Sequence, residues 1–306
     1  MAKDKKKKQS ENIYYIIQTM NLFTTNTCNF ACSHCKRGNL DGKHLDDRTI
    51  ASIFKNVYQI DTLNLNGGEV FSNPDVLRKV LNRIKEKQIV VFQLSIITNG
   101  TLFTEEIETI LDDFSLYLAD HGGRNIQIPL SQDEYHTAQL EKIKRENPVL
   151  YMRYQENIDR LQNSSYYGGP NKLGYIINEG RAKDLDIPGK IETRAYPHIC
   201  YLDRKTFKEI DKPILFLGGI TGIDVNGIFC DTAGTMPPSK DRCYGNLKTH
   251  NYYEIAKRSV FPFENTFEDY CERCATELKA ANTYFNPPGT TFQNTGAYIK
   301  TTSQLQ

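Results

Sequence analysis

The feature that most constrains the fold is the alternation of strand-like and helix-like segments between residues 13 and 182. Runs of β-branched and aromatic residues are typical of strands, and apolar residues at three- and four-residue spacing are typical of helices. Short connections between them predict parallel strands joined by right-handed crossovers. We expect strands at 13–25, through Leu63 and Leu65, and at 89–97, 126–130 and 173–177, with helices at 47–60, from Pro74 to Ile84, around 107–111, and over 136–163.

Polar and glycine-containing motifs come directly after the predicted strands. Because the carboxyl ends of parallel strands meet at one edge, and ligands bind there, we expect these motifs to surround one site. They are the cysteines from Cys28 to Cys35, Gly67-Gly68-Glu69, Thr98-Asn99-Gly100, Ser131-Gln132-Asp133 and Gly180-Arg181-Ala182.

The first motif, Cys28-x3-Cys32-x2-Cys35, places three thiols within eight residues. Three thiolates can wrap one soft metal centre. A structural zinc site requires four ligands, and no fourth cysteine lies close by in the sequence. A four-iron cluster held by three cysteines instead leaves one iron open. The chain has eight cysteines, which could also form disulfides, but in a reducing cytosol such groups are more often metal sites.

On this triplet and the motifs that follow it, the chain resembles the radical S-adenosylmethionine (radical SAM) superfamily from about residue 14 to 185. The resemblance implies an α/β fold, a partial (β/α)6 barrel. It also implies a [4Fe-4S] cluster that binds S-adenosylmethionine and cleaves it reductively to a 5′-deoxyadenosyl radical, which abstracts a hydrogen atom from a substrate. An external electron donor such as flavodoxin or ferredoxin would supply the electron.

The same resemblance implies roles for individual residues. Gly67 and Gly68 would let the backbone approach the cofactor, and Glu69 would accept a hydrogen bond from the methionine ammonium group. Asn99 matches a family motif or belongs to a simple turn. Ser131 would bind the ribose or the carboxylate, and Arg181 would pair with the carboxylate or cap a helix. His34 stands where the family usually has an aromatic residue against the adenine, a role that Phe30 could share.

After about residue 185, helices become rare and Gly, Pro and Cys frequent. We expect a β-hairpin over 213–229, with its turn at Gly218-Gly219. The second cysteine group resembles the shortened auxiliary-cluster domain called twitch, and four cysteines could hold a second [4Fe-4S] cluster or a tetrahedral zinc. Its members are Cys230, Cys243, Cys271 and Cys274. We therefore predict a basic disordered tail at 1–13, the partial barrel at 14–185, an auxiliary domain at 186–282 and a mobile tail at 283–306.

Cys200 belongs to neither group. Two interpretations stand: a small buried hydrophobic residue, or a catalytic thiol that donates a hydrogen atom to a substrate radical, as in radical peptide epimerases.

The charge balance bears on partners and location. The formal net charge is +1, so bulk attraction to nucleic acid or an anionic membrane is not indicated, and the run Lys3–Lys8 reads as a solvated tail. We find no apolar stretch long enough to span a bilayer and no signal peptide, and we expect a cytoplasmic protein.

For the substrate, the leading hypothesis is a ribosomally synthesised peptide modified by epimerisation or cross-linking. About a dozen residues precede the first predicted strand, which counts against tight leader-peptide binding. The alternatives are dehydrogenation of a small sugar or amino-cyclitol, and a non-catalytic zinc-binding protein.

Overall fold

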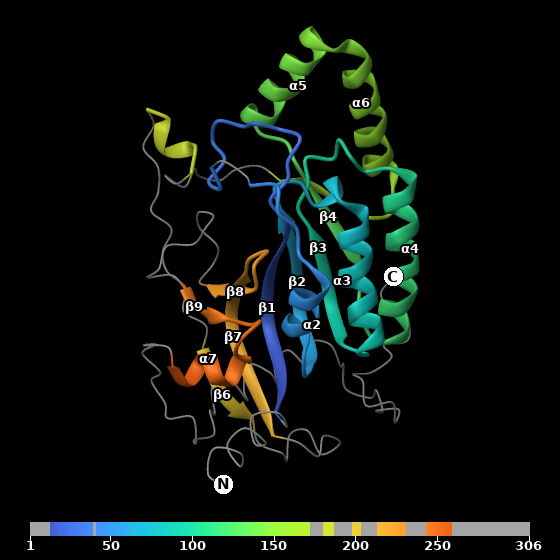
Figure 1. Cartoon of the computed structure of the whole chain (residues 1–306). Helices are drawn as coiled ribbons and strands as arrows, with labels where there is room; N and C mark the ends of the chain where they lie inside the picture. The colour runs from blue at the N-terminus through green and yellow to red at the C-terminus, as the bar shows by residue number, and fades with distance from the viewer. Residues whose placement is uncertain are drawn as a thin grey trace.

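A single nine-stranded sheet organises the chain (Figure 1). In this computed structural model the described residues are 13–38, 41–171, 180–186, 198–202, 213–230 and 243–258; within 198–202 only the side chain of Ile199 is described. The first five strands are parallel neighbours in chain order, and the alternation predicts the first four of them but not β5. They are β1 (Tyr14–Thr25), β2 (Val57–Gly67), β3 (Val90–Ile96), β4 (Ile126–Ser131) and β5 (Tyr167–Asn171).

Helices connect these strands, and α3 and α4 lie side by side on one face of the sheet (Figure 1). The predicted apolar stripe of α3 is confirmed, because Val76, Leu77, Val80, Leu81 and Ile84 are all buried. The helices are α2 (Asp47–Ile53), α3 (Pro74–Glu86), α4 (Glu105–Asp120), α5 (Glu134–Glu146), α6 (Pro148–Asn163) and α7 (Tyr252–Arg258), with short 3-10 turns η1 (Val70–Ser72) and η2 (Ala182–Asp184).

Two predicted helix ranges are wrong. The helix expected over 47–60 ends at Ile53, because Asn56 has a positive φ of 59° that stops it, and Val57 already starts β2. The helix expected over 136–163 is two helices. Pro148 has no N–H to continue α5, and the Asn147 side chain caps α6 by accepting from the Leu150 N–H at 3.1 Å.

The carboxyl-terminal strands extend the same sheet beyond β1. Strand β7 (Ile214–Ile223) runs parallel to β1, and β6 (His198–Leu202), β8 (Ile228–Cys230) and β9 (Cys243–Asn246) follow as antiparallel strands. The predicted hairpin exists, but its turn is misplaced: β7 continues through Gly218-Gly219, and the chain turns between Asp224 and Gly227. The strand expected at 173–177 and both predicted tails lie outside the described residues, apart from Ile13.

The two faces of the sheet differ in chemistry. One face carries the apolar side chains of the main core, such as Leu63, Leu65 and Leu94. The opposite face carries uncharged polar side chains that are in register across four strands. This polar row consists of Asn21, Asn64, Ser95 and Gln127, and it starts beside Gly222 of β7. Within the described ranges, no helix is long and apolar enough to cross a bilayer.

Candidate functional site

The cysteine triplet lies on the loop that follows β1, at the carboxyl edge of the parallel strands. Cys32 is buried, while Cys28 and Cys35 are partly buried, and all three are free thiols. The loop turns tightly, because the Cys35 N–H donates to the Cys32 carbonyl at 3.2 Å. Cys32 packs against Phe30 and Tyr154, so an apolar wall covers one side of the group.

Glu69 joins three of the predicted motifs. Its side chain is only 1% exposed. Carboxylate oxygen Oε1 accepts from the Thr98 hydroxyl at 2.7 Å and the Phe71 N–H at 3.1 Å, and Oε2 accepts from the Asn99 N–H at 2.8 Å. The Glu69 N–H donates to the Thr27 carbonyl, next to Cys28. Burial raises the pKa of the Glu69 carboxyl group, and the hydrogen bonds from Asn99, Thr98 and Phe71 oppose that rise.

The two glycines before Glu69 serve close backbone contact with the end of β1. The Gly68 N–H donates to the Thr25 carbonyl at 2.8 Å. A Cβ atom on Gly67 would come within 2.9 Å of the Thr25 Cγ2 atom, closer than real side chains approach. These glycines therefore fix the strand end from which the cysteine loop departs.

Asn99 ties the end of β3 to the cysteine loop. Its Nδ2 donates to Asn29 Oδ1 at 3.0 Å, and its Oδ1 accepts from the Thr101 hydroxyl at 2.6 Å. Asn29 returns a hydrogen bond to the same Thr101 hydroxyl at 2.8 Å. The turn interpretation also holds, because Gly100 has a positive φ of 76°. Asn29 stands next to Cys28 but belongs to none of the predicted motifs.

Arg181 fastens the far end of the loop. Its Nε donates to the Cys32 carbonyl and its backbone N–H to the Cys35 carbonyl, both at 2.9 Å. Gly180 has a φ of 60°, and a side chain there would collide with the Lys36 carbonyl and the Gly38 N–H. The predicted Gly-Arg-Ala element thus contacts the triplet directly, and Arg181 is also the residue that precedes η2.

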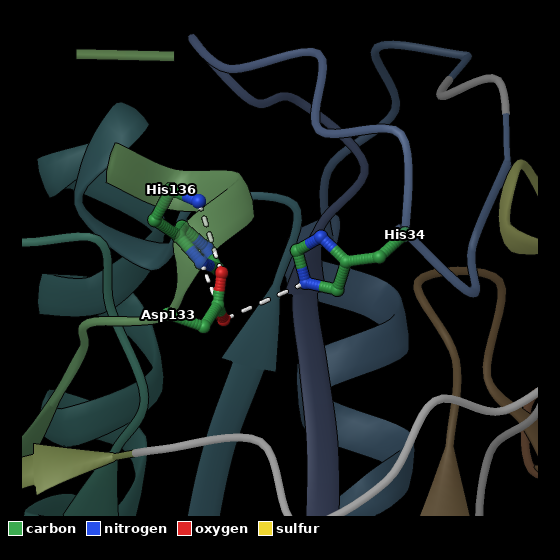
Figure 2. Close-up of side chains that lie close together, drawn as sticks. All are labelled: His34, Asp133 and His136. Carbon is green, nitrogen blue, oxygen red and sulfur yellow. Dashed lines mark hydrogen bonds and ion pairs between the residues drawn. The ribbon is translucent and has the colours of Figure 1, made fainter. Parts of the chain in front are cut away.

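His34, Asp133 and His136 form a compact group beside Cys32 (Figure 2). Asp133 begins α5 and accepts from the His136 Nδ1 at 2.8 Å, while the His34 Nε2 lies 3.7 Å from the same carboxylate oxygen. The ring centroids of His34 and Tyr135 are 4.5 Å apart. Ligand atoms of the three residues lie within 4.8 Å of one another, so they could hold a metal ion. The hydrogen bonds and helix cap already account for their arrangement.

His136 was missed in the sequence. Its spacing of three residues after Asp133 at a helix start was the available signal. Ser131 lies at the end of β4, where its N–H donates to the Thr98 carbonyl at 2.8 Å. The ends of β1, β2, β3 and β4 therefore meet, as the motif positions predict.

The triplet fits an iron–sulfur cluster. Burial raises the pKa of the Cys28 and Cys32 thiols to about 12, with Glu69 adding to the rise at Cys28 and the neighbouring cysteines at both. A metal favours the thiolate and reverses this shift. Three soft ligands in a partly apolar loop suit iron and sulfide, and they leave one metal position without a protein ligand.

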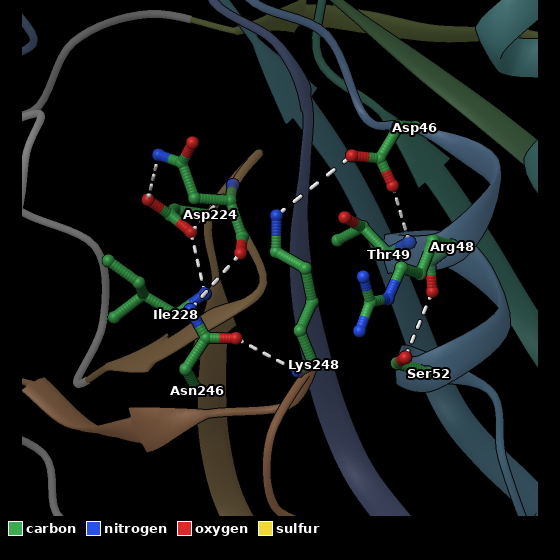
Figure 3. Close-up of polar contacts among 9 residues, drawn as sticks. Asp46, Arg48, Thr49, Ser52, Asp224, Ile228, Asn246 and Lys248 are labelled. Atoms are coloured by element: carbon green, nitrogen blue, oxygen red, sulfur yellow. Dashed lines mark hydrogen bonds and ion pairs between the residues drawn. The ribbon is translucent and has the colours of Figure 1, made fainter.

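The structure also brings together two members of the second cysteine group. Cys230 of β8 and Cys243 of β9 are paired across the antiparallel ladder, and Cys230 is buried. The preceding turn is fixed by Asp224, which accepts from the Ile228 N–H at 2.7 Å and the Asn226 N–H at 2.9 Å, and Lys248 reaches from the end of β9 to Asp46 at 3.9 Å (Figure 3). Cys271 and Cys274 lie outside the described residues.

Cys200, the predicted catalytic thiol, lies on β6 toward the end of the sheet opposite the triplet. Its β6 position pairs with Phe216, which pairs with Ile16 near the start of β1. The triplet follows the other end of β1 at Thr25, roughly 30 Å away at about 3.3 Å per residue. A hydrogen-atom donor must reach the substrate radical formed near the triplet, so this position opposes the role.

The parallel sheet with three thiols at its carboxyl edge defines an α/β partial barrel built to hold an iron–sulfur cluster. Residues 22–167 match the family model described as "Radical SAM superfamily". The chain therefore contains a radical SAM domain over residues 22–167, and this family implies a [4Fe-4S] cluster and S-adenosylmethionine. No curated protein matches its sequence significantly.

Solved structures give weak likenesses. Streptococcus suis SuiB bound to precursor peptide SuiA is 12% identical, with 90% of this chain and 72% of that chain covered and a TM-score of 0.38. SuiB bound to S-adenosylmethionine is 13% identical, with coverage of 89% and 73% and a TM-score of 0.37. Native anSMEcpe with bound AdoMet and Cp18Cys peptide is 12% identical, with coverage of 85% of each chain and a TM-score of 0.39. These values carry no argument about substrate.

Proposed function

We propose that this chain is an enzyme that holds a [4Fe-4S] cluster on Cys28, Cys32 and Cys35 and cleaves S-adenosylmethionine reductively. The observation that carries the proposal is the attachment of the cysteine loop to the ends of neighbouring strands through Glu69, Asn99 and Arg181. When bound, cluster and cofactor supply a 5′-deoxyadenosyl radical for hydrogen-atom abstraction. An external one-electron donor of the flavodoxin or ferredoxin type belongs to the same proposal.

The protein's own residues orient the cofactor and exclude water. A carboxylate has about four acceptor sites, and Glu69 uses three of them within the protein, which leaves one on Oε2 for an ammonium group. Arg181 donates its Nε to the loop, so its terminal nitrogens can meet a carboxylate. Ser131, at the end of β4, stays the proposed partner of the ribose or carboxylate. Phe30 and Tyr154 keep solvent from one side of the triplet.

The polar row supports an uncharged, hydrogen-bonding substrate. Asn21 and Asn64 are joined by a hydrogen bond of 2.8 Å, and Gln93 contacts Gln127 on the same face. The amide side chains of Asn and Gln offer both donors and acceptors, which match the N–H and C=O groups of a peptide backbone. Asp61 is the only charged residue in β1, β2, β3, β4 and β7, and its neighbour Thr62 rather than Asp61 shares the face of the row.

We therefore favour a peptide over an amino-cyclitol as the substrate. The protonated amine of an amino-cyclitol requires a carboxylate partner when it is desolvated, and the row offers none. The second cysteine group is proposed to hold an auxiliary cluster, with zinc as the alternative; the ladder pairing of Cys230 and Cys243 supports a shared metal centre but does not choose between them.

Anaerobic reconstitution tests the core proposal. The reconstituted chain, given dithionite and S-adenosylmethionine, should form 5′-deoxyadenosine, and the Cys32→Ala variant should not. Equal 5′-deoxyadenosine formation by the two proteins would refute the proposal that the chain is a radical enzyme. Zinc in place of iron and sulfide in the purified chain would refute it as well.

A second assay tests the substrate class. A random nonapeptide pool should stimulate 5′-deoxyadenosine formation above the substrate-free rate, whereas a panel of amino-cyclitols should not. Asn64→Asp places a negative charge in the polar row, so it should weaken the peptide effect. Stimulation by amino-cyclitols that increases in Asn64→Asp would reverse the substrate assignment and leave the radical chemistry intact.

A further inference from the structure

Arg37 is a buried cation that the proposed chemistry leaves without a role. It stands two residues after Cys35, in a turn closed by the Gly38 N–H donating to the Cys35 carbonyl at 3.2 Å. Its side chain is 7% exposed, and its guanidinium carbon lies 3.5 Å from the centroid of the Phe23 ring in β1. The turn therefore folds Arg37 back over the strand that leads into the triplet.

The guanidinium group is incompletely satisfied. Its NH1 nitrogen is buried and has no hydrogen-bond partner among the residues that the structure describes. A buried N–H without a partner costs about 1–3 kcal/mol, and more when the group is charged. Arginine cannot escape this cost by losing its proton near neutral pH, so the position calls for an anion.

The surroundings of Arg37 contain few candidates for that anion. Phe23 and Val225 are apolar and pack together. Asp224 accepts three hydrogen bonds in the β7–β8 turn, from Ile228 and Asn226, and none from the Arg37 NH1 nitrogen (Figure 3). Burial lowers the pKa of Arg37 to about 10, while Cys35, Cys230 and Asp224 oppose the shift through their charge.

We infer that Arg37 is a positioning residue for the iron–sulfur site, whose buried positive charge and unpaired N–H stabilise the Cys35 side of the cluster and raise its reduction potential. This inference rests on the proposed function. Added negative charge in the reduced cluster is favoured by a nearby cation in a weakly screened interior, and hydrogen bonds to ligand sulfur act in the same direction.

The test is an electron paramagnetic resonance redox titration of the whole reconstituted protein. It follows the reduced-cluster signal that responds to S-adenosylmethionine. Arg37→Gln should shift the midpoint potential to more negative values, while Arg37→Lys, which keeps the charge, should stay near wild type. Arg48→Gln removes an equal charge from an exposed position of α2 and should shift nothing.

Each outcome of this titration either supports or overturns the proposed role of the Arg37 charge. An unchanged potential in Arg37→Gln overturns the inference, as do equal shifts in Arg37→Gln and Arg37→Lys, which would mean a packing role. If Arg37→Gln folds by circular dichroism but takes up no iron while Arg37→Lys is loaded, the charge is required. If neither variant is loaded, the charge role is rejected. Failure of the proposed function looks different, because wild type would then lack a signal that responds to S-adenosylmethionine.

Discussion

The two cysteine groups sit on the same sheet but are held in different ways. The triplet from Cys28 to Cys35 lies on a loop that hydrogen bonds attach to Thr101, Glu69 and Arg181, which are distant in the sequence. Cys230 and Cys243 are placed by the register of β8 and β9, strands of three and four residues. The first arrangement is over-determined by several contacts, so its geometry is defined before a metal binds. The second depends on the short β7–β8 and β8–β9 ladders.

The largest expected effect separates the two groups by function. Cys32→Ala should lower 5′-deoxyadenosine formation by more than about 100-fold, because even the loss of an outer partner of a metal ligand costs about 10- to 100-fold. Cys243→Ala should retain cofactor cleavage and lower the iron content from about eight toward about four per chain. Loss of cofactor cleavage in both variants would mean that the two cysteine groups form one centre and do not differ in function.

The next largest effect is expected from removing the Glu69 carboxylate, which accepts hydrogen bonds beside the first group. Glu69→Ala leaves the Thr98 hydroxyl and two buried N–H groups without an acceptor, so the free energy of unfolding should fall by about 3 kcal/mol or more. Anaerobic urea unfolding followed by circular dichroism measures it. Asp75→Ala, at an exposed ion pair, should cost about 0.5 kcal/mol or less. Similar losses in the two variants would show that Glu69 does not hold the loops together.

A smaller effect tests the far end of the loop. Arg181→Ala removes the Nε hydrogen bond to the Cys32 carbonyl, and iron should be lost to a chelator about 10- to 100-fold faster than from wild type. Arg181→Lys keeps the charge but lacks the planar Nε donor, so it should fall between the two. Chelation kinetics at fixed pH provide the measurement. Wild-type kinetics in Arg181→Ala would show that the Arg181 hydrogen bond does not stabilise the loop.

The smallest expected effect lies away from both groups. Cys200→Ala should leave cofactor cleavage and product formation within about twofold of wild type, because β6 pairs with the part of β7 that lies beside the opposite end of β1. Retained cleavage with abolished product would restore the hydrogen-donor role and would require a route between the two ends of the sheet.

The sequence predicts what depends on local pattern. Strand and helix periodicity gives the order of the parallel strands, and motif position gives the edge where Glu69, Asn99 and Arg181 gather. It fails where one residue interrupts a pattern, as Asn56 and Pro148 do. The turn predicted at Gly218-Gly219 is instead an irregularity within β7. Gly219 has a positive φ of 80°, and the pairing with β1 shifts register there and resumes at Ile220.

Other features depend on distant contacts and have no local signal. The Arg181 side chain donates its hydrogen bond to the Cys32 carbonyl, which lies 149 residues earlier in the chain. The burial of Arg37 follows from how its turn folds over Phe23, which periodicity does not encode. The motif predicts that Glu69 binds a ligand, whereas its carboxylate accepts three hydrogen bonds from the protein itself.

The pairing of β1 with β7 has a consequence for biosynthesis. Tyr14 of β1 pairs with Ile214 of β7, about 200 positions later in the chain. One edge of β1 therefore stays unpaired while most of the polypeptide emerges from the ribosome. The Phe23–Val225 contact beneath Arg37 forms only after that edge closes. A nascent chain interrupted before residue 214 would therefore present the strand that leads into the triplet with a Phe23 ring that Val225 does not yet cover.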